Sequence, residues 1–150
     1  ASLEKTWELF SNPANLQKIT PESMKFKVLS ELPDNIFSGQ IIDYKVSPLF
    51  GIPLSWRTEI TDVKQGEFFV DEQRIGPYSR WHHEHHFRAI DGGVEMTDIV
   101  EYKNPLGLLG KFANNILVKK KLKKIFEYRF RKVEEMFGKW EGQIPMIEIT

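Results

Sequence analysis

The sequence predicts an α+β fold in which a curved antiparallel sheet wraps around one long helix. Two short helical segments open the chain, several segments with strand periodicity follow, and a single long amphipathic segment comes after them. A sheet accompanied by one long helix buries the apolar stripe of that helix on its concave face. We therefore expect a cavity between sheet and helix wherever the lining side chains do not fill the space.

The chain opens directly at a helix start. Ser2 is a suitable N-cap, and Leu3, Trp7 and Phe10 recur at helical spacing. Asn12-Pro13 then offers an N-cap and a first-turn proline for a second short helix, which Thr20-Pro21 ends.

From Met24 the apolar period changes from about 3.6 to 2. We expect strands at about 24–32, 36–46, 54–63, 67–75, 79–90 and 93–103. Turn residues separate these segments: Asp34-Asn35, the loop from Pro48 to Pro53, Gln65-Gly66, Gly76-Pro77-Tyr78 and Asp91-Gly92.

A breaker-rich connection, 105–110, leads into a long helix at about 109–137, which Gly138 ends. One stripe of this helix is formed by Leu122, Ile125, Phe126, Arg129, Val133 and Met136.

Composition excludes several classes of protein. A length of 150 residues suits one domain, 1–150, and the absence of cysteine excludes a disulfide scaffold, a zinc ribbon and a thiol nucleophile. Lys plus Arg and Asp plus Glu both number 21, so no basic excess favours nucleic acid. No apolar run approaches the roughly 20 residues of a membrane span and no signal peptide opens the chain, so we expect a cytoplasmic protein. The aromatic share of 13% supplies many bulky side chains for so small a domain.

Several stretches together resemble the SRPBCC, or START-like helix-grip, superfamily, and more narrowly its bacterial branch of small uncharacterised ligand-binding proteins. They span about 7–130: residues 7–16 with Thr20-Pro21, Gly76-Pro77-Tyr78 leading into 81–87, Asp91-Gly92-Gly93 with Thr97-Asp98, Glu101-Tyr102 with Pro105-Leu106-Gly107, and 126–129. The resemblance implies a helix-grip fold around an apolar cavity. It leaves the activity open, because the superfamily includes binders, carriers and cyclases.

One feature departs from that pattern. Members of the superfamily begin with a strand before the first helix, and this chain does not. The segment 144–149 reads as a strand placed after the long helix, and joining it to the first residues restores the usual opening. We therefore expect a circularly permuted chain, natural or engineered, in which 144–149 supplies the first strand. The alternative is a truncated start with an unrelated tail.

The segment 79–90 carries the residues best suited to chemistry. Alternation places Trp81, His83, His85 and Phe87 on one face, expected inward, and His82, Glu84, His86 and Arg88 on the other. If Asp91-Gly92 is a two-residue turn, His85 lies opposite Asp98. If 76–78 is a three-residue turn, His83 lies opposite Asp71, and Gln73 opposite Trp81. Cross-strand pairs lie about 4.5–5.5 Å apart at Cβ, within hydrogen-bonding reach.

Three interpretations of this cluster remain open at the level of sequence. It is a satisfied polar network on a sheet face, the polar end of a ligand cavity, or a metal site or general acid/base. The sequence supplies neither a nucleophile nor a fixed oxyanion site, which argues against the third interpretation, and we expect no metal and no cofactor. The outward pair, His82 and His86, indicates a solvated sheet face.

The candidate ligand-binding residues combine this cluster with aromatic and apolar side chains from strands and helix: Trp56, Asp71, Gln73, Trp81, His83, His85, Phe87, Asp98, Tyr102, Phe112, Ile116 and Phe126. The lysine run 119–124 indicates a solvated helix face, with weak contact to an anionic membrane as the functional alternative. The expected state is a monomer or a strand-swapped dimer.

Three functions are consistent with these observations. The first is binding or carriage of a hydrophobic small molecule such as a lipid, isoprenoid or polyketide-like ring, without catalysis. The second is a cyclase-, aromatase- or hydrolase-like enzyme that uses a cavity histidine to move protons. The third is an engineered scaffold whose cavity is filled by its own side chains.

Overall fold

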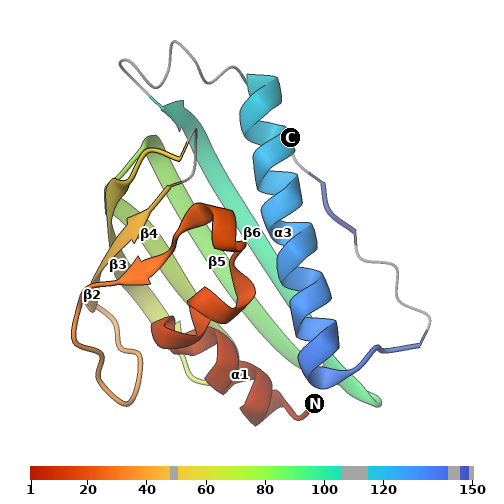
Figure 1. Cartoon of the computed structure of the whole chain (residues 1–150). Coiled ribbons are helices and arrows are strands. Elements are labelled where there is room, and N and C mark those ends of the chain that lie inside the picture. Colours follow the sequence, from red (N-terminus) through yellow and green to blue (C-terminus); the bar gives the residue numbers. More distant parts are fainter. Residues whose placement is uncertain (48–50, 106–114, 142–145, 149–150) are drawn as a thin grey trace.

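The computed structural model describes the chain except residues 48–50, 106–114, 142–145 and 149–150. The described part forms one antiparallel sheet of six strands in the order β1 to β6, with each strand paired to the next along the chain. The helix α3 crosses one face of this sheet, and α1 lies near one end of it (Figure 1). The predicted α+β helix-grip class is confirmed.

The helices at the start of the chain form where capping residues predict them. The helix α1 spans Leu3–Ser11, and the side chain of Ser2 accepts a hydrogen bond of 3.3 Å from the backbone N–H of Lys5. A 3-10 helix, η1, spans Pro13–Ile19, and the side chain of Asn12 accepts from the N–H of Ala14 at 3.0 Å. A second 3-10 turn, η2, spans Glu22–Met24 and was not predicted.

The sheet consists of β1 (Lys27–Val28), β2 (Ile41–Val46), β3 (Leu54–Lys64), β4 (Phe68–Ile75), β5 (Tyr78–Ile90) and β6 (Gly93–Pro105). The last four match the predicted segments closely. Two bulges in the pairing of β3 with β4, between Arg57 and Thr58 and between Ile60 and Asp62, help to bend the sheet around α3.

The first two predicted strands are wrong in length. β1 covers only two residues of the expected 24–32, because Lys25 takes a left-handed backbone conformation (φ 47°) and the Ser30 side chain accepts from the N–H of Asp43. β2 begins at Ile41 rather than 36, because the chain turns at Gly39 (φ 92°), and the N–H of Gln40 donates to the carbonyl of Phe37 at 3.2 Å.

The helix α3 spans Asn115–Phe137, so the predicted start at 109 lies outside the described residues. The helix ends as predicted at Gly138, which has a φ of 87° and donates its N–H to the carbonyl of Glu134 at 2.8 Å. Val118 and Leu122 are its buried residues. No helix in the described part of the chain is long and apolar enough to cross a membrane.

An aromatic core lies at the α1 end of the sheet. Trp7 and Phe10 of α1 pack onto Phe69 and Phe87, and the rings of Trp7 and Phe87 meet edge to face with centroids 5.3 Å apart. Val133 and Phe137 of α3 pack against the same cluster. This core fixes the end of α3 relative to the sheet, which positions the remainder of the helix over the concave face.

The tail does not supply a strand within the residues that the structure describes. Met146–Glu148 have no strand conformation and none of them pairs with β1 to β6, whereas 144, 145 and 149 lie outside the described residues. Met146 is 89% exposed, so its apolar side chain gains nothing from packing against the sheet. The expectation of a permuted first strand is therefore not met at residues 146–148.

Candidate functional site

A cavity lies between the concave face of the sheet and α3. It contains about 150 Å³ of space that the centres of water molecules could occupy. One water needs roughly 10–15 Å³ of such space, so the cavity could hold a ligand of on the order of ten to fifteen non-hydrogen atoms. The lining is mainly apolar and comes from α1, η1, the strands β2 to β5, α3 and the segment before β1. It includes Phe26, Ile42, Trp56, Ile60 and Leu122.

Four titratable side chains from three neighbouring strands gather beside this cavity. β5 carries His83 and His85, β4 carries Asp71, and β6 carries Asp98. The predicted register is confirmed: Asp71 lies opposite His83, and Asp98 lies opposite His85. We refer to these four residues as the His–Asp cluster.

The side chains of the His–Asp cluster cross over relative to the backbone register. Nε2 of His83 lies 2.9 Å from Oδ1 of Asp98, and Nε2 of His85 lies 2.7 Å from Oδ2 of Asp71. Nδ1 of His85 is 2.9 Å from Asp98 but lacks the geometry of a hydrogen bond. The two imidazole centroids are 3.7 Å apart, and both residues are 5% exposed or less.

The pKa values of the two histidines are shifted in opposite directions. Burial and the neighbouring charge of His85 lower the pKa of His83. Burial also opposes protonation of His85, but hydrogen bonding to Asp71 and the proximity of Asp98 outweigh it and raise the pKa of His85. The histidines in turn hold the pKa of both carboxyl groups below the ordinary value, despite burial. The cluster therefore combines two carboxylates, one favoured imidazolium and one favoured neutral imidazole.

Asp71, His83 and His85 could each offer one ligand atom to a metal, since those atoms lie within 4.8 Å of one another. Two observations favour hydrogen-bonded ion pairs over a cation there. Nε2 of each histidine is already bonded to an aspartate, and the guanidinium of Arg129 interacts electrostatically with Asp71 and Asp98. A metal ion would have to replace the histidine–aspartate hydrogen bonds and bind close to the positive charge of Arg129.

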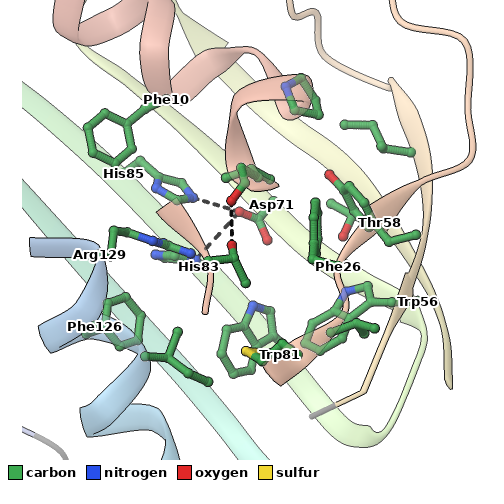
Figure 2. A pocket seen from close by; sticks show the side chains of 18 of the residues that line it. Phe10, Phe26, Trp56, Thr58, Asp71, Trp81, His83, His85, Phe126 and Arg129 are labelled. Atoms are coloured by element: carbon green, nitrogen blue, oxygen red, sulfur yellow. Dashed lines mark hydrogen bonds and ion pairs between the residues drawn. The ribbon is translucent and has the colours of Figure 1, made fainter. Parts of the chain in front are cut away.

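Arg129 of α3 is one of the cavity-lining residues that the sequence prediction missed. It lines the cavity and reaches from α3 toward His83 and His85 (Figure 2). Its guanidinium carbon lies 5.4 Å from the ring centroid of Phe126. A signal was present in the sequence, because Arg129 falls on the apolar stripe of the long helix, where a charged side chain is unusual.

The structure brings half of the predicted ligand-binding residues to the cavity. They are Trp56, Asp71, Trp81, His83, His85 and Phe126. Asp98 lies behind them and bonds to His83 rather than lining the space. Figure 2 shows Trp56 and Trp81 at the opposite side of the pocket from His85.

The other predicted residues lie elsewhere. Phe87 belongs to the aromatic core under α1 and does not line the cavity, whereas Phe10 and Phe69 of the same core do. The pairing of β4 with β5 ends at Glu72 and His82, so Gln73 does not pair with Trp81. Its side-chain amide instead bonds to the backbone N–H and carbonyl of Tyr78.

Tyr102 packs against Val118 and Leu122 outside the cavity lining. Ile116 is 66% exposed on α3, and Phe112 lies outside the described residues.

The outer face of the sheet carries the second histidine pair. His82 lies 2.7 Å from Glu72 and 3.1 Å from Glu84, and His86 lies 2.8 Å from Glu84. These partly exposed ion pairs match the predicted solvated sheet face.

Comparisons with known proteins place the fold. The structure is similar to protein CV1439 from Chromobacterium violaceum (TM-score 0.70, 13% identity, covering 93% of this chain and 91% of that chain). It is also similar to protein Ms6760 from Mycobacterium smegmatis (TM-score 0.65, 16% identity, covering 91% of this chain and 84% of that chain). A third similar structure is ginseng major latex-like protein 151 from Panax ginseng (TM-score 0.64, 13% identity, covering 91% of this chain and 89% of that chain). Protein-family models and curated proteins give no match to the sequence. The likeness is therefore one of fold.

Proposed function

We propose that this chain binds a hydrophobic small molecule in the cavity between the sheet and α3. The observation that carries the proposal is the cavity itself: about 150 Å³ of mostly apolar space with polar side chains gathered on one side. Pockets that bind small molecules combine an apolar lining with a few convergent polar groups in this way. The shared fold with the ginseng protein is compatible with the proposal, although it bears only on architecture.

The apolar lining would supply the affinity. Ile42 and Ile60 lie on the sheet side and Leu122 on the helix side, and each of them is 3% exposed or less. Apolar surface that leaves water contributes about 25 cal/mol per Å². The His–Asp cluster would orient the ligand by hydrogen bonds rather than add much affinity, since its members already bond to one another.

The test is a titration with a neutral apolar fluorophore, N-phenyl-1-naphthylamine, in the wild type and in a variant with a filled cavity. Thr58 lines the cavity and is 4% exposed, so Thr58→Phe places a ring in the binding space. The matched control is Thr97→Phe, the same substitution at an exposed position on the outer face of β6.

We expect saturable binding to the wild type and to Thr97→Phe, and an affinity at least about tenfold weaker in Thr58→Phe, a loss of about 1.4 kcal/mol. No saturable binding to the wild type, or equal binding to the two variants when both are folded by circular dichroism, would refute the proposal. Tryptophan fluorescence gives a second readout, because Trp56 and Trp81 line the cavity.

A further inference from the structure

Arg129 is a partly buried cation whose side chain has no hydrogen-bonded partner among the described residues. The structure shows no hydrogen bond and no ion pair within 4.0 Å for its side chain anywhere in the described part of the chain, and its Nε atom is fully buried. Arginine carries five N–H donors and stays protonated in proteins. Leaving a buried donor unsatisfied costs about 1–3 kcal/mol, and more for a charged group.

The neighbouring aspartates do not relieve this deficit. Asp71 and Asp98 attract Arg129 electrostatically, but neither forms a hydrogen bond with it, and each directs one oxygen, Oδ2 of Asp71 and Oδ1 of Asp98, to a histidine at 2.7–2.9 Å. Among the described residues, the ring of Phe126 packs against the guanidinium with its centroid 5.4 Å away, and it offers no lone pair. Since Arg129 lines the cavity, its free donors are available to a molecule inside it.

From this arrangement we infer that the ligand is an amphipathic carboxylic acid whose carboxylate pairs with Arg129 while its apolar body fills the cavity. This inference rests on the proposed function. The planar fork of a guanidinium matches the two oxygens of a carboxylate, and such bidentate pairs are stronger than neutral hydrogen bonds. A neutral hydroxyl or carbonyl group has a single oxygen and accepts fewer of the free donors.

The size of the cavity restricts the apolar body. Space for roughly ten to fifteen non-hydrogen atoms suits an acid of medium length, such as decanoic acid with about twelve. The donors of Arg129 lie beside the His–Asp cluster, whereas Trp56 and Trp81 line the cavity elsewhere, so head and body have separate surroundings (Figure 2).

The experiment compares decanoic acid with 1-decanol by isothermal titration calorimetry on the full chain at about pH 8, where the acid is ionised. We expect decanoate to bind the wild type at least about tenfold more tightly than decanol. In Arg129→Met that preference disappears through loss of decanoate affinity, and Arg129→Lys retains part of it because the charge remains without the fork. The control Arg131→Met removes an exposed arginine from the same helix and leaves both affinities unchanged.

Each outcome separates this inference from the proposed function. If decanol binds the wild type as tightly as decanoate, or if Arg129→Met weakens both probes equally, the inference is overturned and the apolar binding function stands. If neither probe binds the wild type, the proposed function fails with it. The comparison of the two probes on the wild type needs no variant, so a misfolded Arg129→Met would not protect the inference.

Discussion

The substitution Asp98→Asn tests whether the His–Asp cluster holds the sheet together. Asp98 accepts a hydrogen bond from His83 at 2.9 Å and lies 2.9 Å from Nδ1 of His85. Both histidines are 5% exposed or less, so water cannot replace the lost partner. Asparagine keeps the shape and one acceptor oxygen but removes the negative charge that stabilises the imidazolium of His85.

The structure sets the size of the effect. One charge-assisted hydrogen bond is worth about 1.5–3 kcal/mol, and breaking a buried ion pair by removing one partner costs about 3–5 kcal/mol. Because the side chain of Asp98 is 21% exposed and asparagine still accepts a hydrogen bond, we expect a loss of about 2–4 kcal/mol in the free energy of unfolding. Urea denaturation at constant slope measures this loss.

The loss should depend on pH. Because the pKa of His85 is raised in the folded state, its contribution to stability is complete below the unfolded value of 6.5 and disappears as pH rises through the folded pKa. Asp98→Asn lowers that folded pKa, so the loss should be larger at about pH 5.5 than at about pH 8.5. Asp98 itself stays ionised over this range, since its pKa is lowered from 3.8.

The matched control is Asp43→Asn, which removes an aspartate that also binds its partner tightly, with Nε of Arg57 at 2.8 Å. Both of those side chains are exposed to solvent, so the change should be much smaller. Equal losses in the two variants, or a loss in Asp98→Asn that does not change with pH, would refute the reasoning about the buried cluster.

Three further predictions follow from the same coordinates. In an NMR titration of the imidazoles, the midpoint for His85 should lie above 6.5 and that for His83 below it, because burial and the charge of His85 disfavour protonated His83 while the aspartates outweigh burial at His85; a shared midpoint would contradict the crossed pairing. Phe87→Ala should lower the free energy of unfolding by about 3–5 kcal/mol in urea yet leave decanol affinity unchanged, since Phe87 is buried but does not line the cavity; a matching loss of affinity would place it in the site. Gly92 has a φ of 74° in the β5–β6 turn, so Gly92→Val should lower the free energy of unfolding by about 1–2 kcal/mol, and Gly92→Asn should lower it less. Equal melting midpoints for the two variants would contradict this prediction.

The register of the sheet could be read from the sequence because short turns fix it. Once Asp91-Gly92 forms a two-residue turn, every pair from Ile90 and Gly93 outward follows, including His85 opposite Asp98. β1 could not be predicted in the same way. Its residues have the composition of a strand, but the left-handed Lys25 and the side chain of Ser30 replace ladder contacts, which depends on how the segment meets β2.

The sequence predicted which residues form the His–Asp cluster but not which of them are hydrogen-bonded to one another. Strand alternation identified the inward histidines and their aspartates, yet backbone register assigned each histidine to the aspartate with which it does not form its hydrogen bond. The crossing arises from side-chain rotamers, which the packing of the two imidazoles against each other decides. Arg129 was not predicted as a site residue for a related reason. Helical periodicity shows which face of α3 a residue lies on, but not how close that face comes to the sheet.

Cavity and unpaired arginine together explain why a ligand would stabilise this fold. Water held against the mostly apolar lining of the cavity is a cost that a ligand removes, at about 25 cal/mol for each Å² of apolar surface that leaves water. The unsatisfied guanidinium adds a second cost beside it. An apolar alcohol offsets only the first cost, whereas an acid that also pairs with Arg129 offsets both. Decanoate should therefore raise the unfolding midpoint more than decanol at equal concentration, by an increment that Arg129→Met removes.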